Sequence, residues 1–121
     1  MPYLTVNDAT FYYEDIGSGV PLVFFHGFMG SGRSDTSAEL DWLATRYRVI
    51  APDLRGFGQS ATPEDGYTKK AMAQDIHALV KSLNYDRIRL VGHDIGLMVA
   101  YAYAAQYPAE VDRVVLMEAF L

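Results

Sequence analysis

The stretch RLVGHDIGLMVAYAYAAQYP, residues 89–108, decides the fold of this chain. An apolar run ends at Gly92, Asp94 stands between Gly92 and Gly96, and an Ala-rich apolar segment with helical spacing follows. A strand that turns sharply into a helix brings the residues two before and two after its tip into contact, and glycine at both places removes the clashing Cβ atoms. The pattern predicts a strand, a tight turn with Asp94 at its tip, and a helix over residues 95–107.

A carboxylate at such a tip lies at a helix N-terminus, where backbone N–H groups and the helix dipole favour an anion. Asp94 alone could be an ordinary N-cap, because Asp is a preferred capping residue. Caps do not require glycine on both sides, however. Gly92 and Gly96 therefore favour a functional side chain that projects over the end of a sheet.

The rest of the chain alternates between strand and helix patterns. Residues 3–6 and 10–16 are predicted to form an antiparallel hairpin, split by the turn signal Asn7-Asp8. The apolar segments VPLVFFHG, YRVIAPDLRG, RIRLVG and RVVLMEA have the pattern of strands buried on both faces.

Helices are predicted between these strands. One has Ser34 or Asp35 as its cap and carries Leu40, Leu43 and Ala44 at helical spacing, and another covers residues 68–83. Alternation of this kind predicts one α/β domain over residues 1–121, with a mostly parallel sheet and helices on both faces. Ligands in such sheets bind outside the carboxyl ends of the strands.

A second motif, FFHGFMGSG, ends the first of the buried strands at His26 and Gly27. The backbone N–H of Phe28 and that of Ile95, just after Asp94, are then expected to point at one spot. Two convergent N–H donors make an oxyanion hole. The motif alone could also be a simple Gly-rich turn, but the two motifs together are more specific than either.

Composition narrows the class of protein. The chain has 121 residues, half of them hydrophobic, and a formal net charge of −5 without a basic run, which argues against nucleic acid as a partner. The absence of cysteine excludes disulfides and thiolate chemistry. The N-terminus lacks the pattern of a secretory signal, and the longest apolar run is too short to span a bilayer. We therefore expect a cytoplasmic protein with no membrane partner.

The order of hairpin, HGF, DLRGFGQS, GHDIG and VLMEA resembles the N-terminal half of the α/β-hydrolase fold, over essentially the whole chain. With Asp at the turn where many members have Ser, the sequence is most similar to bacterial epoxide hydrolases, and then to haloalkane and haloacetate dehalogenases. Ile95 and Phe28 stand where haloalkane dehalogenases usually have Trp and Asn, and the Arg of haloacetate dehalogenases is missing. The segment HGFMGSGR looks more like esterases and C–C hydrolases that use Ser. The DLRGFGQS segment resembles a loop of the family whose role is mainly structural.

The resemblance implies a nucleophilic Asp94. A carboxylate suits displacement at a saturated carbon, and the product with a small apolar epoxide or halide is an alkyl ester of the enzyme. Phe28 and Ile95 would stabilise the oxyanion that forms when water attacks this ester. The motif residues that support the site are His26, Gly27, Gly92, His93 and Gly96. No cofactor and no metal is implied.

Glu118 follows the last predicted strand and is, by the same resemblance, the acid that orients a catalytic histidine. Its alternative is a solvated carboxylate at a strand end. The family takes its histidine base from a loop after the last strand, and the sequence offers only His26, His77 and His93. None of the three stands at that place, because His26 belongs to the oxyanion turn, His93 should point away, and His77 lies on the helix of residues 68–83. The family's lid domain has no counterpart here either. We therefore expect alkylation of Asp94 without turnover.

The last strand, RVVLMEAFL, forms an apolar sheet edge that invites pairing with another chain. We expect a homodimer or higher oligomer through this strand. Three origins remain open: a fragment or engineered half of a hydrolase, a natural truncated product, and a half-domain that completes itself in a symmetric dimer. The functional alternatives to an epoxide-hydrolase-like core are a non-catalytic self-associating module and a dehalogenase.

Overall fold

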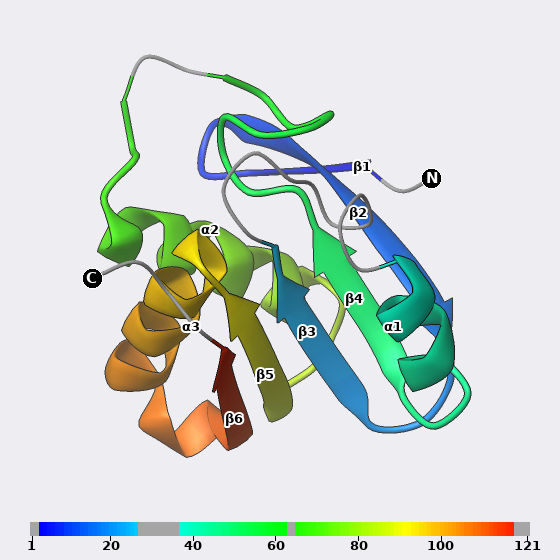
Figure 1. The fold of residues 1–121 in the computed structure, drawn as a ribbon. Helices are drawn as coiled ribbons and strands as arrows, with labels where there is room; N and C mark the ends of the chain where they lie inside the picture. The colour runs from blue at the N-terminus through cyan, green and yellow to red at the C-terminus, as the bar shows by residue number, and fades with distance from the viewer. Residues whose placement is uncertain (1–2, 27–36, 63–64, 118–121) are drawn as a thin grey trace.

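Six strands form one sheet in the computed structural model, which describes residues 3–26, 37–62 and 65–117. The elements are β1 (Tyr3–Val6), β2 (Ala9–Gly17), β3 (Pro21–Phe25), α1 (Ser37–Leu43), β4 (Arg48–Pro52), α2 (Lys69–Ser82), β5 (Ile88–His93), α3 (Ile95–Gln106), the short 3-10 helix η1 (Pro108–Glu110) and β6 (Val111–Met117). The predicted hairpin and the strand–helix alternation are confirmed (Figure 1).

The strand order is β1-β2-β4-β3-β5-β6. β2 pairs antiparallel with both β1 and β4, whereas β3 pairs parallel with β4 and β5, and β5 pairs parallel with β6. Asn7 and Asp8, at the tip of the hairpin, have φ angles of 49° and 62°. Two positive φ angles in a two-residue connection are those of a type I′ turn, which matches the twist of the strands it joins.

Helices cover both faces of the sheet, as the buried strands require. α1 lies on one face, and α2 and α3 lie together on the other (Figure 1). Because side chains alternate along a strand, β3 contributes to both layers: Val23 and Phe25 belong to the larger core under α2 and α3, and Leu22 and Phe24 belong to the smaller core beside α1. The strand is therefore the centre of the hydrophobic interior.

α2 matches its predicted bounds within one residue at each end. Thr68 is the N-cap, and its Oγ1 accepts a hydrogen bond from the N–H of Ala71 at 3.1 Å. α1 ends at Leu43, so Ala44 lies just beyond it and donates its N–H to the Leu40 carbonyl at 2.9 Å. The two capping candidates of this helix, Ser34 and Asp35, lie outside the described residues.

Hydrogen bonds between Asp53, Gln59 and Ser60 fix the conformation of the loop that follows β4. The N–H of Gln59 donates to Oδ2 of Asp53 at 2.9 Å, and Oγ of Ser60 donates to the Asp53 carbonyl at 2.5 Å. The N–H of Tyr12 in β2 donates to Oγ of Ser60 at 3.0 Å. This polar network ties the loop to the antiparallel half of the sheet.

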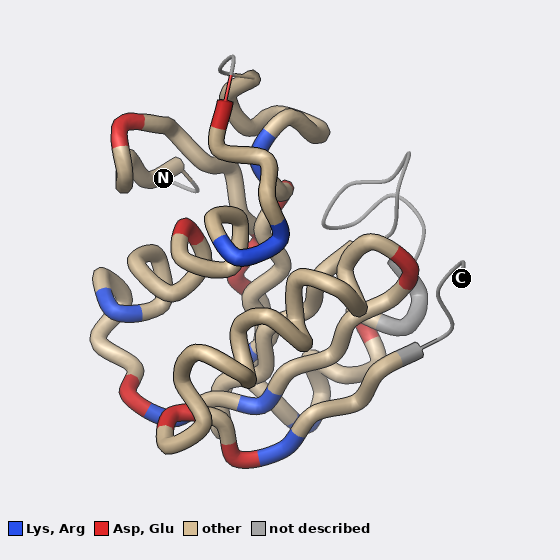
Figure 2. Tube along the Cα trace, turned by 90° about the vertical axis from the view of Figure 1, so that its left-hand side faces the viewer, with Lys and Arg blue, Asp and Glu red and all other residues tan. Residues whose placement is uncertain are grey.

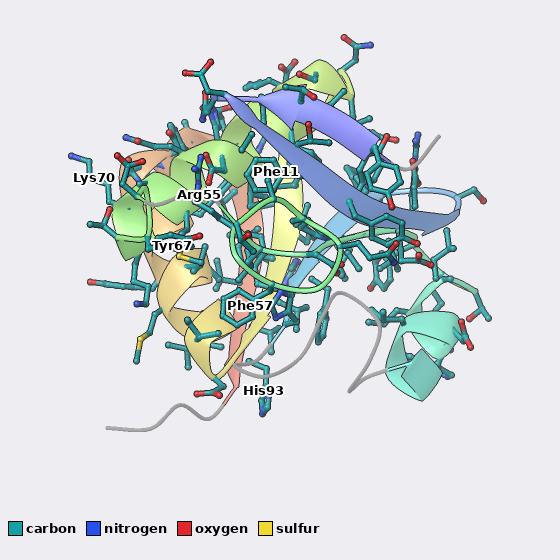
Figure 3. The ribbon with its side chains drawn as sticks, turned by 90° about the horizontal axis from the view of Figure 1, so that it is seen from above. Phe11, Arg55, Phe57, Tyr67, Lys70 and His93 are labelled. Carbon is teal, nitrogen blue, oxygen red and sulfur yellow. The ribbon has the colours of Figure 1, made fainter. Side chains whose placement is uncertain are left out.

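Arg55 and Asp75 form a buried ion pair that joins this loop to α2. Nε and Nη2 of Arg55 each donate to a carboxylate oxygen of Asp75 at 2.8 Å, and Nδ2 of Asn7 donates to the same carboxylate at 3.3 Å. The guanidinium lies 5.7 Å from the ring centre of Phe11 (Figure 3). The hydrogen bonds that the Arg55 guanidinium donates to the Asp75 carboxylate raise the pKa of Arg55 above its ordinary value. Loop, helix and hairpin turn are thus held together at one buried point.

Charged residues are distributed along the described chain without a continuous basic stripe, and α3 has none (Figure 2). No helix within the described residues is both long enough and apolar enough to cross a bilayer.

Candidate active site

The connection between β5 and α3 is a single residue. β5 ends at His93, α3 begins at Ile95, and Asp94 between them has φ 58° and ψ −118°. A non-glycine residue with positive φ at this ψ is strained, and such strain persists only where the surrounding structure holds it. The predicted sharp turn from strand to helix is present, with Asp94 at its tip.

The two glycines of the turn lie where no Cβ atom fits. A Cβ on Gly92 would lie 2.9 Å from Cβ of Ala100, and one on Gly96 would lie 2.5 Å from the carbonyl oxygen of His26. The contact at Gly96 shows that the start of α3 lies directly against the end of β3, so the GHDIG motif lies beside His26.

Asp94 does not cap α3 through its side chain, because no hydrogen bond joins its carboxylate to the N–H groups of the first turn. The hydrogen bond that would make Asp94 an ordinary N-cap is therefore absent. The first N–H groups of a helix have no partner within the helix, and Ile95 is the first residue of α3. Its N–H has the position in the chain that an oxyanion donor needs.

His26 fixes the end of β3. Its side chain is 1% exposed, and its Nε2 accepts a hydrogen bond from the N–H of Leu54 at 3.0 Å. A ring nitrogen that accepts carries no proton, so the neutral ring holds its proton on Nδ1. The ring also meets that of Phe57 edge to face at 5.1 Å (Figure 3). His26 thereby joins the end of β3 to the loop after β4.

Three predicted site residues lie outside the described part of the chain: Gly27, Phe28 and Glu118. The described register between β5 and β6 pairs His93 with Met117, the residue before Glu118 in the sequence. The oxyanion role of Phe28 and the acid role of Glu118 stay predictions.

Of the other two histidines, His77 lies on α2, and His93 is the last residue of β5, next to Asp94. His77 on α2 stacks on Tyr107, with ring centres 3.6 Å apart, and its Nε2 lies 3.2 Å from a carboxylate oxygen of Glu110. Gly92 faces α3, so strand alternation puts His93 on the opposite face of the sheet. Nδ1 of His93 is buried, and none of the residues that the structure describes forms a hydrogen bond with it.

Glu110 is the acceptor of a small surface network. Lys81 forms an ion pair with it, and His77 approaches it from the same helix. The hydrogen bond from Lys81, followed by that from His77, lowers the pKa of Glu110. Across the described residues, no group of three or more His, Cys, Asp or Glu side chains forms a candidate metal site.

Sequence reasoning missed two contacts that shape the site. The bond from Leu54 to His26 and the pair of Arg55 with Asp75 join segments that are distant in the sequence. A weak signal for the second was available, since Asp75 is the one acidic residue among the buried positions of α2. The sequence alone does not say which partner lies opposite.

Residues 20–121 match the model of the alpha/beta hydrolase fold family, and the chain belongs to that family. Among its relatives is the soluble epoxide hydrolase of a Corynebacterium species, which is 38% identical over 93% of this chain and 39% of its own length. A non-heme haloperoxidase of Rhodococcus erythropolis is 38% identical over 98% of this chain and 44% of its own length.

Solved structures give the same assignment. The epoxide hydrolase CorEH superimposes with a TM-score of 0.94 at 37% identity, over 97% of this chain and 41% of that one. The meta-cleavage product hydrolase CumD superimposes with a TM-score of 0.89 at 33% identity, over 97% and 44%. The chain thus spans less than half the length of these relatives, and its similarity to epoxide hydrolases is clear both in sequence and in structure.

Proposed function

We propose that Asp94 is the nucleophile of an epoxide-hydrolase-type reaction on a small apolar epoxide. The observation that carries this proposal is the strained backbone of Asp94 at the tip between β5 and α3, where Gly92 and Gly96 admit no side chain. An ordinary capping residue needs neither the strain nor the glycines. The epoxide hydrolases among the relatives support the same chemistry.

The first step is a displacement. A carboxylate oxygen of Asp94 attacks a ring carbon of the epoxide, the ring C–O bond breaks, and the released alkoxide takes a proton from water. The product is a 2-hydroxyalkyl ester on Asp94. In the second step water attacks the ester carbonyl, and the N–H groups of Ile95 and Phe28 would stabilise the oxyanion.

The second step needs a base for the attacking water, and we propose that these 121 residues do not provide one. His26 is buried and accepts from Leu54, and His77 is stacked on Tyr107 beside Glu110. Glu118 would orient a histidine from a loop after the last strand, and none of the three histidines of this sequence stands there. The expected activity is one alkylation per chain, without release of diol.

The test is intact-mass spectrometry of the protein after incubation with styrene oxide. One added mass per chain, mapped to Asp94 by peptide analysis, is expected. Asp94→Asn should remain unmodified. Asp86→Asn, which removes a carboxylate that is 94% exposed, is the matched control and should be alkylated like the unchanged protein. Equal modification of Asp94→Asn would refute the nucleophile, and repeated diol formation would refute the single-turnover claim.

A halide substrate is the alternative for the same nucleophile. A parallel incubation with 1-bromohexane separates the two, because displacement there releases one bromide ion per ester formed. Bromide release without reaction of styrene oxide would favour a dehalogenase over an epoxide hydrolase.

A second candidate function, self-association, rests on the edge strand β6. Within the described sheet β6 pairs only with β5, and its Val115 and Leu116 are 53% and 45% exposed. We propose that a second copy pairs with this edge in the plane of the sheet. Light scattering should show a dimer or larger species that Val115→Lys weakens. A monomer at high micromolar concentration would refute it.

A further inference from the structure

Two consecutive residues in the loop after β4 are anchored to different elements. The backbone N–H of Leu54 donates to Nε2 of His26, at the end of β3, at 3.0 Å. The next side chain, Arg55, donates from Nε and Nη2 to the two carboxylate oxygens of Asp75 on α2, each at 2.8 Å. His26, Arg55 and Asp75 are 1%, 7% and 2% exposed. One short piece of backbone therefore links α2 to the end of β3, and both of its anchors are buried.

The link continues from His26 to the turn that holds Asp94. The carbonyl oxygen of His26 lies 2.5 Å from the place of a Cβ atom on Gly96, and that of Phe25 lies closer still. The end of β3 is thus packed against the first turn of α3 without a gap. Because Gly96 is two residues after Asp94, a displacement of the end of β3 must move this turn or open the contact.

We propose that Asp75 is a positioning residue for the reaction of Asp94, and that it acts through Arg55, Leu54 and His26. The inference rests on the proposed nucleophile and adds a residue on α2 that takes no part in the chemical steps. In a displacement at an epoxide carbon, the attacking carboxylate must lie in line with the bond that breaks. An error of about 1 Å in the position of a reacting group can lower the rate about a hundredfold.

The chemistry of the Arg55–Asp75 pair favours positioning over stabilisation alone. Apolar residues of similar volume often stabilise a buried site as well as an ion pair does, because the desolvation of two charges offsets their attraction. An arginine–carboxylate pair with two parallel hydrogen bonds, however, fixes distance and orientation together. Nδ2 of Asn7 donates to the same carboxylate at 3.3 Å, which restricts it further. The loop after β4 thus has one defined place relative to α2.

The first test separates position from stability. The double variant Arg55→Met/Asp75→Leu replaces the ion pair by an apolar contact, and its midpoint of urea denaturation should lie near that of the unchanged protein. Alkylation of Asp94 by styrene oxide, followed over time by intact-mass spectrometry, should nevertheless be about tenfold slower at saturating epoxide. The epoxide concentration that gives the half-maximal rate should change little, because the buried pair does not touch the epoxide.

A second variant and a control define what the ion pair contributes. Arg55→Lys keeps the positive charge but loses the two parallel bonds, and its alkylation should be about threefold slower. The matched control is Arg48→Met/Asp15→Leu, which removes a pair in which Nε of Arg48 lies 2.8 Å from Oδ1 of Asp15. Arg48 is the first residue of β4, at the opposite end of the strand from the loop. This control should be alkylated at the rate of the unchanged protein.

The middle of the link has its own pair of variants. His26→Gln keeps an acceptor for the N–H of Leu54, since the glutamine carbonyl can take the place of Nε2. His26→Phe keeps an aromatic ring beside Phe57 but offers no acceptor. Alkylation of His26→Gln should be at least several-fold faster than that of His26→Phe. Equal rates would overturn the role of the bond between Leu54 and His26.

Backbone amide NMR signals test the link without any reaction. The signals of Leu54 and Gly96 should shift in Arg55→Met/Asp75→Leu and stay in place in the control. An unchanged Gly96 signal, or unimpaired alkylation of the double variant, would overturn the proposal. A rate that only follows the fraction of folded protein across the variants would also overturn it. If the unchanged protein is not alkylated at Asp94, the proposed nucleophile fails, and the amide signals alone decide whether the link positions the first turn of α3.

Discussion

The carbonyl oxygen of His26 occupies the space that a Cβ atom on Gly96 would need, since the two would lie 2.5 Å apart. This backbone contact seats the first turn of α3 on the end of β3. It brings the GHDIG motif beside His26, the first residue of the HGF motif, and the position of Asp94 depends on it.

Replacement of Gly96 by alanine should destabilise the protein. In an ordinary helix position Gly→Ala stabilises by about 1 kcal/mol. Here the added Cβ meets rigid backbone, so we expect a loss of about 2–4 kcal/mol in the free energy of unfolding, measured by urea denaturation. Ser82→Ala, at the exposed end of α2, is the control and should change stability by less than about 0.5 kcal/mol. A more stable Gly96→Ala protein would mean that the close approach to β3 is absent.

Replacement of Asp94 should reveal the strain at the tip of the turn. With φ 58° and ψ −118°, this position suits glycine better than any residue with a Cβ. Asp94→Gly should therefore be about 1–2 kcal/mol more stable than Asp94→Ala in urea denaturation. At Asp112, an exposed position in β6, the same pair of substitutions should give the opposite order, because glycine is unfavourable in a strand. The same order at both positions would contradict stored strain at Asp94.

The buried pair of Arg55 and Asp75 should tolerate joint replacement better than single replacement. Asp75→Asn leaves the guanidinium of Arg55 without its counter-charge and should cost about 3–5 kcal/mol. The double variant Arg55→Met/Asp75→Leu removes both charges and should recover most of that loss. Thermal unfolding of the single variants Arg55→Met and Asp75→Leu and of the double variant checks this, and purely additive losses would show that the two residues act independently.

The stability of the network at Glu110 should depend on pH. The pKa of Glu110 is lower in the folded protein than its ordinary value of 4.5. The ionised carboxylate therefore adds to the free energy of unfolding at pH values above 4.5, and this stabilisation is lost as pH falls through the folded-state pKa. Glu110→Gln should therefore lower stability at neutral pH, by less than about 1 kcal/mol because the pair is solvent-exposed. The difference from the unchanged protein should shrink as pH falls below 4.5 and vanish once Glu110 is protonated in the folded state. A difference that persists at acid pH would mean that packing, not charge, is responsible.

Much of the fold could be predicted from local signals in the sequence. Asn7-Asp8 marks the hairpin turn by residues that accept positive φ, Thr68 marks the start of α2, and the uninterrupted apolar residues of β3 predict burial on both faces. Gly92 and Gly96 identified the sharp turn because their spacing around Asp94 has a steric cause. Each of these signals depends on a few neighbouring residues, and the spacing can be recognised without coordinates.

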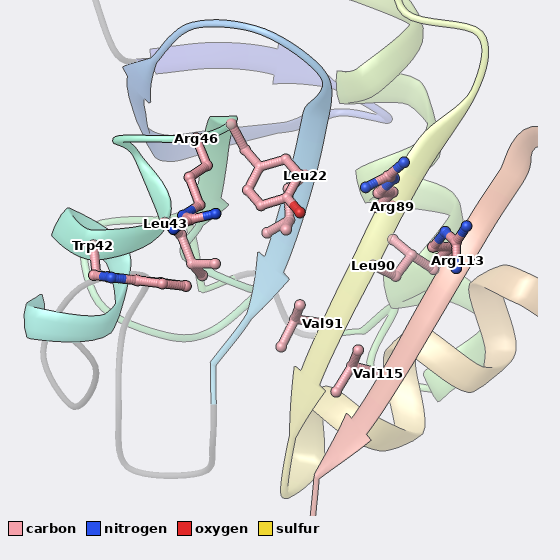
Figure 4. A pocket seen from close by; sticks show the side chains of 10 residues that line it. Leu22, Trp42, Leu43, Arg46, Arg89, Leu90, Val91, Arg113 and Val115 are labelled. Atoms are coloured by element: carbon pink, nitrogen blue, oxygen red, sulfur yellow. The ribbon is translucent and has the colours of Figure 1, made fainter.

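The unpredicted features depend on residues that are distant in the sequence. The pairing of His26 with Leu54 and the burial of Asp75 against Arg55 arise only when the strands take their order in the sheet. The same is true of the pocket between α1 and β6, where arginines from three separate segments line an apolar floor (Figure 4). Contacts of this kind follow from topology, and local propensity does not encode them.

The central place of β3 also bears on the order of folding events. β3 pairs with β4, which follows α1, and with β5, which follows α2, so the strand acquires its two neighbours at very different times during synthesis. Contacts between residues so far apart form slowly, because a long loop must close before they contribute stability. The contact of Gly96 with the carbonyl of His26 at the end of β3 joins residues that are 96 − 26 = 70 positions apart. The geometry of Asp94 is therefore a late product of folding, and ribosome-bound chains that end before α3 lack the contact between Gly96 and the end of β3.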